Sequence, residues 1–222
     1  MVQVGDMWVD IYQTSAAQAV TQEAGVALGF IAAGIPQSKY GQLPITGTEL
    51  MTWYGFTELA GRVGKRMMSY SEWCRQAYGN PGGQAASDDY GWTKTANTAR
   101  TRTGCNVDPI TGLYSPGGGI KPYAVSAYNT VDSVGNVYEW ASDLIGYDGN
   151  GYTYTWRNIV SGGENKGQLY TPNVDDAFRA FLCGGGWNNG VDAGPRCAAT
   201  HGSPWGVAAN NGCRLACDKL SA

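Results

Sequence analysis

The chain has 222 residues, enough for one large domain or two small ones, and 15 basic and 18 acidic residues give it a net charge of -3. Only 15% of the residues are charged and no basic run occurs, so the sequence lacks the electrostatic pattern of a nucleic-acid-binding protein. Its 33 glycines, 8 tryptophans and 14 tyrosines are typical of a compact, loop-rich protein with aromatic anchors, and they exclude a disordered or mainly helical chain.

The N-terminus and the cysteines bear on the compartment. Residues 1–6 contain no basic start and no apolar core, so we expect no signal peptide, and Ala24 to Ile35 is too short to span a membrane. The six cysteines permit one or two disulfides, but without a signal peptide and with a large core we favour buried, reduced thiols. These cysteines are Cys74, Cys105, Cys183, Cys197, Cys213 and Cys217.

Few regular elements are predicted near the N-terminus. Met7 to Tyr12 alternates apolar with polar residues and is rich in β-formers, which predicts an opening strand. Ser15 to Phe30 is rich in Ala and Gln and is compatible with a helix, although two glycines weaken that prediction. Gly34 to Gly47 carries two prolines and is predicted to be a connection.

Two helices follow. Thr48 to Ala60 places apolar side chains near helical spacing and predicts an amphipathic helix. Ser69-Tyr70-Ser71-Glu72 matches a capping box, in which Ser69 and Glu72 each bond the other's backbone. The helix that it starts is predicted to run from Tyr70 to Tyr78, before a segment rich in Gly and Pro.

The second half reads as loops and short strands. Gln84 to Tyr123 is polar, rich in Gly and irregular. Within Val131 to Asp143, Gly135-Asn136 predicts a tight turn before a strand. Further strands are predicted from Gly151 to Trp156 and from Phe178 to Leu182. No internal repeat is visible.

The last forty residues, from Leu182 to Ala222, carry the candidate function. Between positions 186 and 212 neither a helical nor a strand period is present, and Gly, Asn, Asp, Ser and Pro dominate. We expect Trp187, Trp205 and Leu215 to anchor these loops to a body. Loops held on a rigid scaffold are the usual place of binding function. The alternative is an irregular, inert C-terminus.

Three motifs in a fixed order resemble the formylglycine-generating-enzyme branch of the C-type lectin fold. They are Gly64-Lys65-Arg66-Met67 with Ser71-Glu72-Trp73, then Gly135-Asn136-Val137-Tyr138-Glu139-Trp140, then Gly184-Gly185-Gly186-Trp187. The resemblance covers most of the chain from Met7 onward. It implies one α+β domain over residues 1–222, with two helices, short antiparallel strands and much irregular structure.

The C-terminal region is similar to the variable proteins of diversity-generating retroelements, phage tropism determinants among them. The matching residues are Gly184 to Asn188, Gly194, Arg196, Pro204, Gly212, Arg214 and Cys217-Asp218. Such elements rewrite adenines in selected codons, mostly AAC, and so vary a binding surface. The resemblance implies a variable ligand-binding region over residues 183–217, with a solvent-exposed face on a mainly fixed backbone. Its twelve diversified positions are Gly186, Asn188, Asn189, Gly190, Asp192, Ala199, His201, Gly202, Gly206, Ala208, Asn210 and Asn211.

The genetic code offers a check on these positions. Replacing the adenines of AAC gives Asn, Gly, Asp, Ala and His among others, but never Trp, Lys, Glu, Gln or Met. All twelve residues lie in the allowed set. Trp205 lies outside it, at a position that the family keeps fixed. Turn chemistry alone also accounts for five of the twelve.

The resemblance implies a ligand-binding display protein on a virion or cell surface, whose partner is a surface protein or another macromolecular ligand. It implies no nucleic-acid partner and no membrane span. The family's amino-terminal trimerisation domains have no counterpart in the sequence, so no oligomeric state is predicted.

The alternative is an oxidase of the formylglycine-generating type, or its inactive relative. Those enzymes oxidise a substrate cysteine with two cysteines of their own, placed between the Gly-Gly-x-aromatic motif and a Cys-Ala-Ala. Residues 188–196 contain no cysteine here, and Cys197 alone cannot replace the pair. We therefore expect no enzyme and no catalytic residues.

Metal and cofactor sites find little support. One histidine, His201, cannot form a His-based triad or the usual zinc patterns. By analogy with the enzyme branch, the region from Asn129 to Glu139 is a candidate for a structural calcium ion. The sequence predicts no other cofactor.

Overall fold

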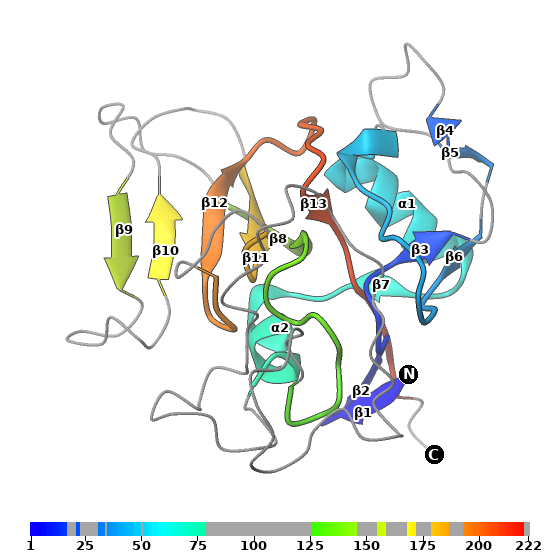
Figure 1. Ribbon diagram of the computed structural model, residues 1–222, viewed down its shortest axis with the longest axis horizontal. Coiled ribbons are helices and arrows are strands. Elements are labelled where there is room, and N and C mark those ends of the chain that lie inside the picture. Colours follow the sequence, from blue (N-terminus) through cyan, green and yellow to red (C-terminus); the bar gives the residue numbers. More distant parts are fainter. Residues whose placement is uncertain are drawn as a thin grey trace.

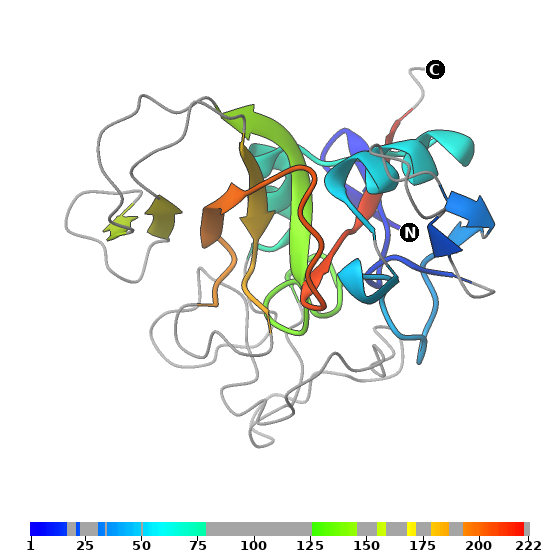
Figure 2. The ribbon, with the colours of Figure 1, turned by 90° about the horizontal axis from the view of Figure 1, so that it is seen from above.

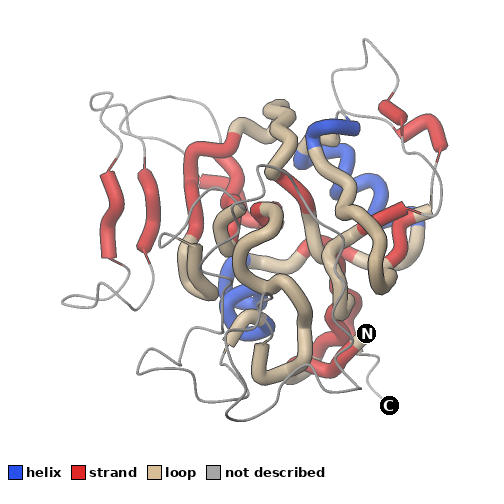
Figure 3. Tube along the Cα trace, in the orientation of Figure 1, coloured by secondary structure: helices blue, strands red, loops and turns tan. Residues whose placement is uncertain are grey.

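The computed structural model describes residues 1–16, 21–22, 31–33, 35–49, 51–78, 126–145, 155–158, 168–171, 179–186 and 193–219 (Figure 3). Two main sheets and two α-helices are the principal elements of this part (Figure 1). Across these ranges, no helix is both long and apolar enough to cross a membrane.

The first sheet brings the two ends of the chain together. Its order is β1-β2-β14-β7, with all neighbours antiparallel. The bounds are Val2–Val4 for β1, Met7–Val9 for β2, Leu215–Asp218 for β14 and Arg66–Met67 for β7. The predicted opening strand is confirmed at Met7–Val9, while the chain beyond Val9 leaves the sheet.

The second sheet has the order β13-β8-β11-β12-β10-β9. The bounds are Asn211–Gly212 for β13, Tyr138–Ile145 for β8, Arg179–Cys183 for β11, Ala198–Gly202 for β12, Gln168–Thr171 for β10 and Thr155–Asn158 for β9. The pairs β13–β8 and β10–β12 are parallel, and the other pairs are antiparallel.

Two predictions in this sheet are confirmed. The predicted strand from Phe178 to Leu182 corresponds to β11. The predicted turn before β8 is present, since Gly135 and Asn136 have φ angles of 80° and 59°. For the strand expected over Gly151 to Trp156, β9 begins at Thr155, and residues 151–154 lie outside the described part.

The helix proposed for Ser15 to Phe30 is wrong at the described positions. Ser15–Ala16 (β3) pairs with Pro36–Gln37 (β6), and Thr21–Gln22 (β4) pairs with Ile31–Ala33 (β5). Pairing between segments outweighs the weak helix propensity of this Ala-rich stretch.

The first predicted helix is present but divided. A 3₁₀ turn, η1, covers Gly47–Glu49, and α1 runs from Trp53–Arg62 instead of from Thr48 to Ala60. The division falls at Thr52, whose side chain accepts a hydrogen bond of 3.1 Å from the Gly55 backbone N–H and caps α1.

The second helix, α2, covers Tyr70–Gln76 and starts with the predicted capping box. Ser69 Oγ accepts from the Glu72 N–H at 3.3 Å, and a Glu72 oxygen accepts from the Ser69 N–H at 2.8 Å. Arg66 also binds Glu72, and this ion pair holds the pKa of the Glu72 carboxyl below its usual range. The helix ends two residues before the predicted Tyr78.

Apolar side chains from both sheets and both helices form the core. One cluster gathers Phe56 and Leu59 of α1 with Trp140, Leu182 and Leu215. A second cluster gathers residues of the first sheet with α2 and β11; it contains Val4, Met7, Met68, Trp73, Ala141 and Cys183. Each cluster therefore joins one helix with residues of both sheets.

A buried ion pair joins β8 to the segment before β14. Arg214 is 0% exposed and Glu139 is 1% exposed. Arg214 donates from Nη2 at 2.9 Å and from Nε at 3.1 and 3.2 Å to the Glu139 carboxylate. Its remaining N–H groups donate to the carbonyls of Asp10, Ile11 and Val131.

Glu139 accepts two further hydrogen bonds. Trp73 donates from Nε1 at 2.7 Å and Gln13 from Nε2 at 3.0 Å. Gln13 in turn accepts from Asn136 at 2.8 Å. This network, the Glu139 hub, links α2, β8, the N-terminal segment and the C-terminal segment.

Removing one charge of the hub should strongly destabilise the protein. Arg214→Met leaves Glu139 buried without its partner, and we expect the free energy of unfolding to fall by about 3–5 kcal/mol, measured by urea denaturation. Arg62→Met is the control, because Arg62 pairs with Glu58 at the surface of α1, where the loss should stay below about 1 kcal/mol. Equal losses in the two variants would contradict the role of the hub.

Candidate ligand-binding face

The structure describes eight of the twelve predicted variable positions. β12 carries Ala199, His201 and Gly202, and the loop of residues 203–210 carries Gly206, Ala208 and Asn210. Gly186 follows β11, and Asn211 begins β13. The other four, Asn188, Asn189, Gly190 and Asp192, lie outside the described residues, as does Trp187.

Glycines set the start of the segment. Gly184 and Gly185 have φ angles of 85° and 81°, a region that other residues rarely adopt. A Cβ at Gly184 would also lie 2.9 Å from the Trp73 ring. The Gly184 N–H donates to the Cys197 carbonyl at 2.8 Å, and the Gly184 carbonyl accepts from Gly194 at 3.2 Å. Glycine is thus required by the backbone at positions 184 and 185.

Two backbone bonds fix the first half of the 203–210 loop. The Gly206 N–H donates to the Ser203 carbonyl at 2.7 Å and closes a tight turn. The Trp53 N–H donates to the Pro204 carbonyl at 3.2 Å and ties this turn to the start of α1. Figure 2 shows the loop leaving β12 and crossing over β8 on its way to β13.

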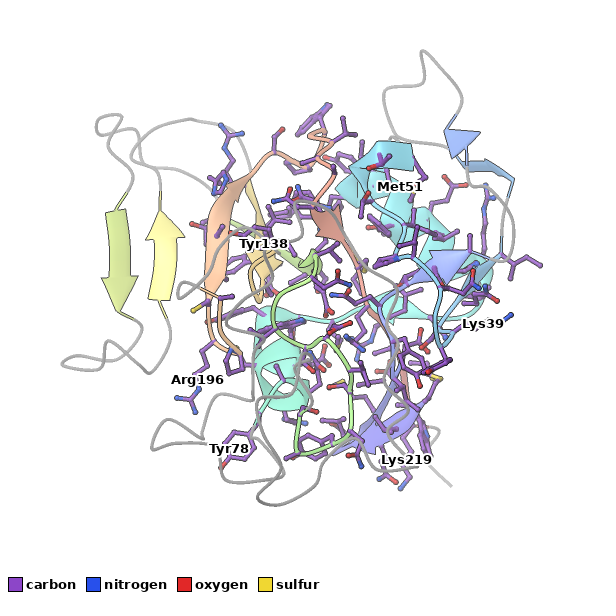
Figure 4. All side chains as sticks on the ribbon, in the orientation of Figure 1. Lys39, Met51, Tyr78, Tyr138, Arg196 and Lys219 are labelled. Atoms are coloured by element: carbon purple, nitrogen blue, oxygen red, sulfur yellow. The ribbon has the colours of Figure 1, made fainter. Side chains whose placement is uncertain are left out.

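The second half of the loop is fixed in the same way. The Ala208 carbonyl accepts from the N–H groups of Gly47 at 2.9 Å and Asn211 at 3.0 Å. The Asn210 carbonyl accepts from the Tyr138 N–H at 2.7 Å. Gly47 allows the close approach of Ala208, because a Cβ at position 47 would lie 2.1 Å from the Ala208 nitrogen. Tyr138 lies in the interior, whereas Arg196 points away from the body of the protein (Figure 4).

The expectation of a solvent-exposed face is wrong at four positions. Gly186, Ala199, Gly202 and Asn211 are buried, and Ala199 is only 1% exposed. Ala199 packs in the core cluster that contains Trp140 and Leu182 of the same sheet. Gly202 lies against the Trp140 ring, which a Cβ would approach to 2.6 Å.

Four described positions reach solvent in part. They are His201, Gly206, Ala208 and Asn210. Three of them lie on the loop that α1, η1 and β8 hold through backbone bonds. Three partly exposed predicted positions therefore lie on a loop that bonds between main-chain atoms hold in place.

Of the three expected anchors, the structure describes Trp205 and Leu215. Leu215 is buried, which confirms that prediction. Trp205 is 53% exposed, so it does not anchor the loop by burial in the core. Its ring meets Tyr54 edge to face, with centroids 5.5 Å apart.

Sequence reasoning missed Gly47, Trp53 and Tyr54 as supports of the loop. Each contacts a residue about 150 or more positions away, so no local pattern connects them with their partners. A glycine beside a predicted helix start gives no sign that another backbone approaches it.

The surroundings of His201, on the candidate face, shift the pKa of its side chain. This side chain is half-buried on β12, and burial lowers the pKa of its imidazole below the usual 6.5. The positive charge of Arg179 on the neighbouring β11 lowers it further. The folded protein therefore favours the neutral imidazole.

Within the described part, five cysteines are free thiols, and Cys105 lies outside it. Burial raises the pKa of the Cys183 and Cys213 thiols well above the usual range, and raises that of Cys74 to about 11. Cys197 is half-buried, at the start of β12. Thiols with raised pKa values are weak nucleophiles at neutral pH.

Glu139, at the end of the candidate calcium region, fits a calcium ion poorly. Both Glu139 oxygens face hydrogen-bond donors, and the Arg214 guanidinium supplies the positive charge that a cation would bring. Nor do three or more His, Cys, Asp or Glu side chains gather as a metal site anywhere in the described ranges.

Comparison with known proteins extends these observations. A family model described as the sulfatase-modifying factor enzyme 1-like domain matches residues 4–219. A tail fiber receptor-binding protein of Bordetella phage BPP-1 is 28% identical over 174 residues, 76% of this chain and 37% of that protein. A serine/threonine-protein kinase, pkn1, of Chlamydia pneumoniae is 30% identical over 109 residues, 49% of this chain and 15% of the kinase.

Solved structures are similar over the whole chain. The M1 variant of the Major Tropism Determinant superposes with a TM-score of 0.60 and 21% identity, and the U1 variant with 0.57 and 22%. All of this chain is covered, but only 52% and 53% of those chains. The expected α+β C-type lectin fold is therefore confirmed, while the chain spans about half the length of these structures.

The burial of Ala199 predicts unequal tolerance at two variable positions with the same residue. Ala199→Asn places an amide in the core and should lower the free energy of unfolding by at least about 2 kcal/mol. Ala208→Asn is the matched control, because Ala208 is partly exposed, and its change should stay within about 0.5 kcal/mol. Urea denaturation checks both, and similar tolerance at the two positions would contradict the burial pattern.

The lowered pKa of His201 predicts a pH effect. A base with a lower pKa in the folded state stabilises the fold above its unfolded pKa of about 6.5, and this contribution is lost as pH falls through the folded pKa. NMR titration of this single histidine should give a midpoint below 6.5. Arg179→Gln should move the midpoint upward, and a wild-type midpoint above 6.5 would refute the prediction.

Proposed function

The chain belongs to the family of the sulfatase-modifying factor enzyme 1-like domain, and on this premise we propose that it is a ligand-binding display protein diversified by a retroelement. Its partner is a surface protein or another macromolecular ligand, which it binds through residues 183–217. The relative from Bordetella phage BPP-1 that is described as a receptor-binding tail fiber supports this reading.

One observation carries the proposal: backbone atoms hold the segment that bears the variable positions. The loop of residues 203–210 is tied to Trp53, Gly47 and Tyr138 through their N–H groups. A surface that must accept many different side chains cannot depend on those side chains for its shape. Bonds between backbone atoms keep the loop in place whichever residue the diversified codons specify.

Among the twelve proposed variable positions, the proposed ligand contacts in the described part are those that reach solvent. His201, Gly206, Ala208 and Asn210 offer small or polar groups on the described face. Such a face gives few large apolar contacts of its own, so its variable positions contribute little affinity per site. Display of many copies on a virion or cell surface would raise the overall binding strength.

Sequencing of the DNA around the gene tests the proposal. We expect a nearby imperfect copy of the codons for positions 186–211, differing almost only at adenines, together with a reverse transcriptase gene. That result would also fix the set of variable positions. A locus with neither feature would overturn diversification and leave a lectin-fold domain of another kind.

The family description also favours a second candidate, an oxidase of substrate cysteines. The disposition of thiols argues against it, because Cys183 and Cys213 are buried and Cys197 has no second cysteine between positions 188 and 196. We therefore propose that the chain has no such activity and needs no cofactor.

An activity assay separates the two candidates. A cysteine-containing peptide incubated with the protein and oxygen should keep its thiol, with no aldehyde detected by mass spectrometry. Cys197→Ser should behave like the wild type. Aldehyde formation that Cys197→Ser abolishes would establish the oxidase instead.

A further inference from the structure

Trp205 and Val207 form an exposed apolar pair within the candidate face. Trp205 is 53% and Val207 is 46% exposed, although apolar side chains of this size usually pack inside. They flank Gly206, and Ala208 follows directly, so the pair stands beside two variable positions that carry small residues. Tryptophan cannot arise from AAC by replacing adenines, so Trp205 is a fixed residue among variable ones.

Trp205 is exposed but held in place. The tight turn of residues 203–206 and the bond from Trp53 to Pro204 fix its backbone. Its ring meets Tyr54 at 86°, and the Tyr54 ring meets Trp53 at 90° with centroids 5.1 Å apart. Trp53 is fixed in turn, because its Nε1 donates to the Ala141 carbonyl at 2.7 Å. An aromatic side chain held in this way loses little entropy on binding.

The loop that carries the pair has no charged side chain. Residues 202–213 include no Asp, Glu, Lys, Arg or His. Glu58, one turn beyond Tyr54 on α1, is paired with Arg62. A partner that covered this loop with charged groups would lose their hydration without gaining an ion pair from the loop. The chemistry of the loop fits an uncharged, apolar patch.

We propose that Trp205, with Val207, is a fixed apolar contact of the variable face and that the partner is a protein presenting an uncharged, apolar patch to it. The inference rests on the proposed function and adds a constant contact to it. Trp205 supplies affinity common to all variants of the face, while His201, Ala208 and Asn210 select among partners. Aromatic residues at the centre of an interface commonly carry most of its affinity.

Selection from a phage-displayed library of random 12-residue peptides tests this. The wild-type protein is the bait, and the affinities of the selected peptides are measured against variants by biolayer interferometry. We expect peptides rich in aliphatic and aromatic residues, with binding at least ten-fold weaker to Trp205→Ala. Near-UV circular dichroism and thermal melting check that each variant is folded.

Trp8→Ala is the matched control. Trp8 is 39% exposed on β2, in the other sheet, and its removal should leave peptide binding within two-fold. A double variant, His201→Ala with Asn210→Ala, reports on the variable positions separately. Tyr54→Ala keeps Trp205 but removes the ring that orients it, and we expect an intermediate loss.

The outcomes separate the inference from the proposed function. Losses with both Trp205→Ala and the double variant support both. Loss with the double variant alone upholds the proposed function and overturns the role of Trp205. Loss with Trp205→Ala alone supports the apolar contact but counts against the variable face, and no loss with either refutes both. Selected peptides rich in charged residues would overturn the proposal of an apolar protein partner. Binding to a glycan array that requires Trp205 would overturn it as well.

Discussion

The fold buries the charges of Glu139 and Arg214 away from water, and each charge compensates the other for its lost hydration. A buried carboxylate or guanidinium is very costly alone, whereas the pair with its full set of hydrogen bonds is tolerated. Its partners come from α2, from the N-terminal segment and from the loop before β8. The ion pair thus forces four distant parts of the chain into one arrangement, and both sheets depend on it.

Elsewhere there is a division between backbone and side chains: backbone contacts position the candidate face, and side chains form the core. Glycines at positions 47 and 184 allow backbone or an aromatic ring to approach more closely than a Cβ permits. Bonds between main-chain atoms hold both halves of the loop of residues 203–210. The division is incomplete, however, because Ala199 and Gly202 contact the core through the same strand that presents His201.

The sequence predicted the features that depend on interactions between residues close together in the chain. The capping box of Ser69 and Glu72 and the turn at Gly135-Asn136 are present because each is satisfied within a few residues. The β-pairing of residues 15–16 with 36–37 could not be foreseen, since it depends on a partner segment. For the site, family resemblance supplied the positions but not their exposure. Burial at Ala199 depends on packing against residues distant in the sequence, such as Trp140, and Trp205 lies on a turn held by α1.

The position of Arg214 along the chain has a consequence for synthesis. Arg214 and β14 follow every proposed variable position, so the ribosome translates them after the diversified codons. An insertion or deletion of one nucleotide in those codons replaces both, leaving Glu139 without its cation and β2 without one of its two neighbours. Such a chain cannot complete its fold, and proteases remove unfolded chains. Only a chain whose proposed variable segment keeps the correct reading frame can therefore complete this fold.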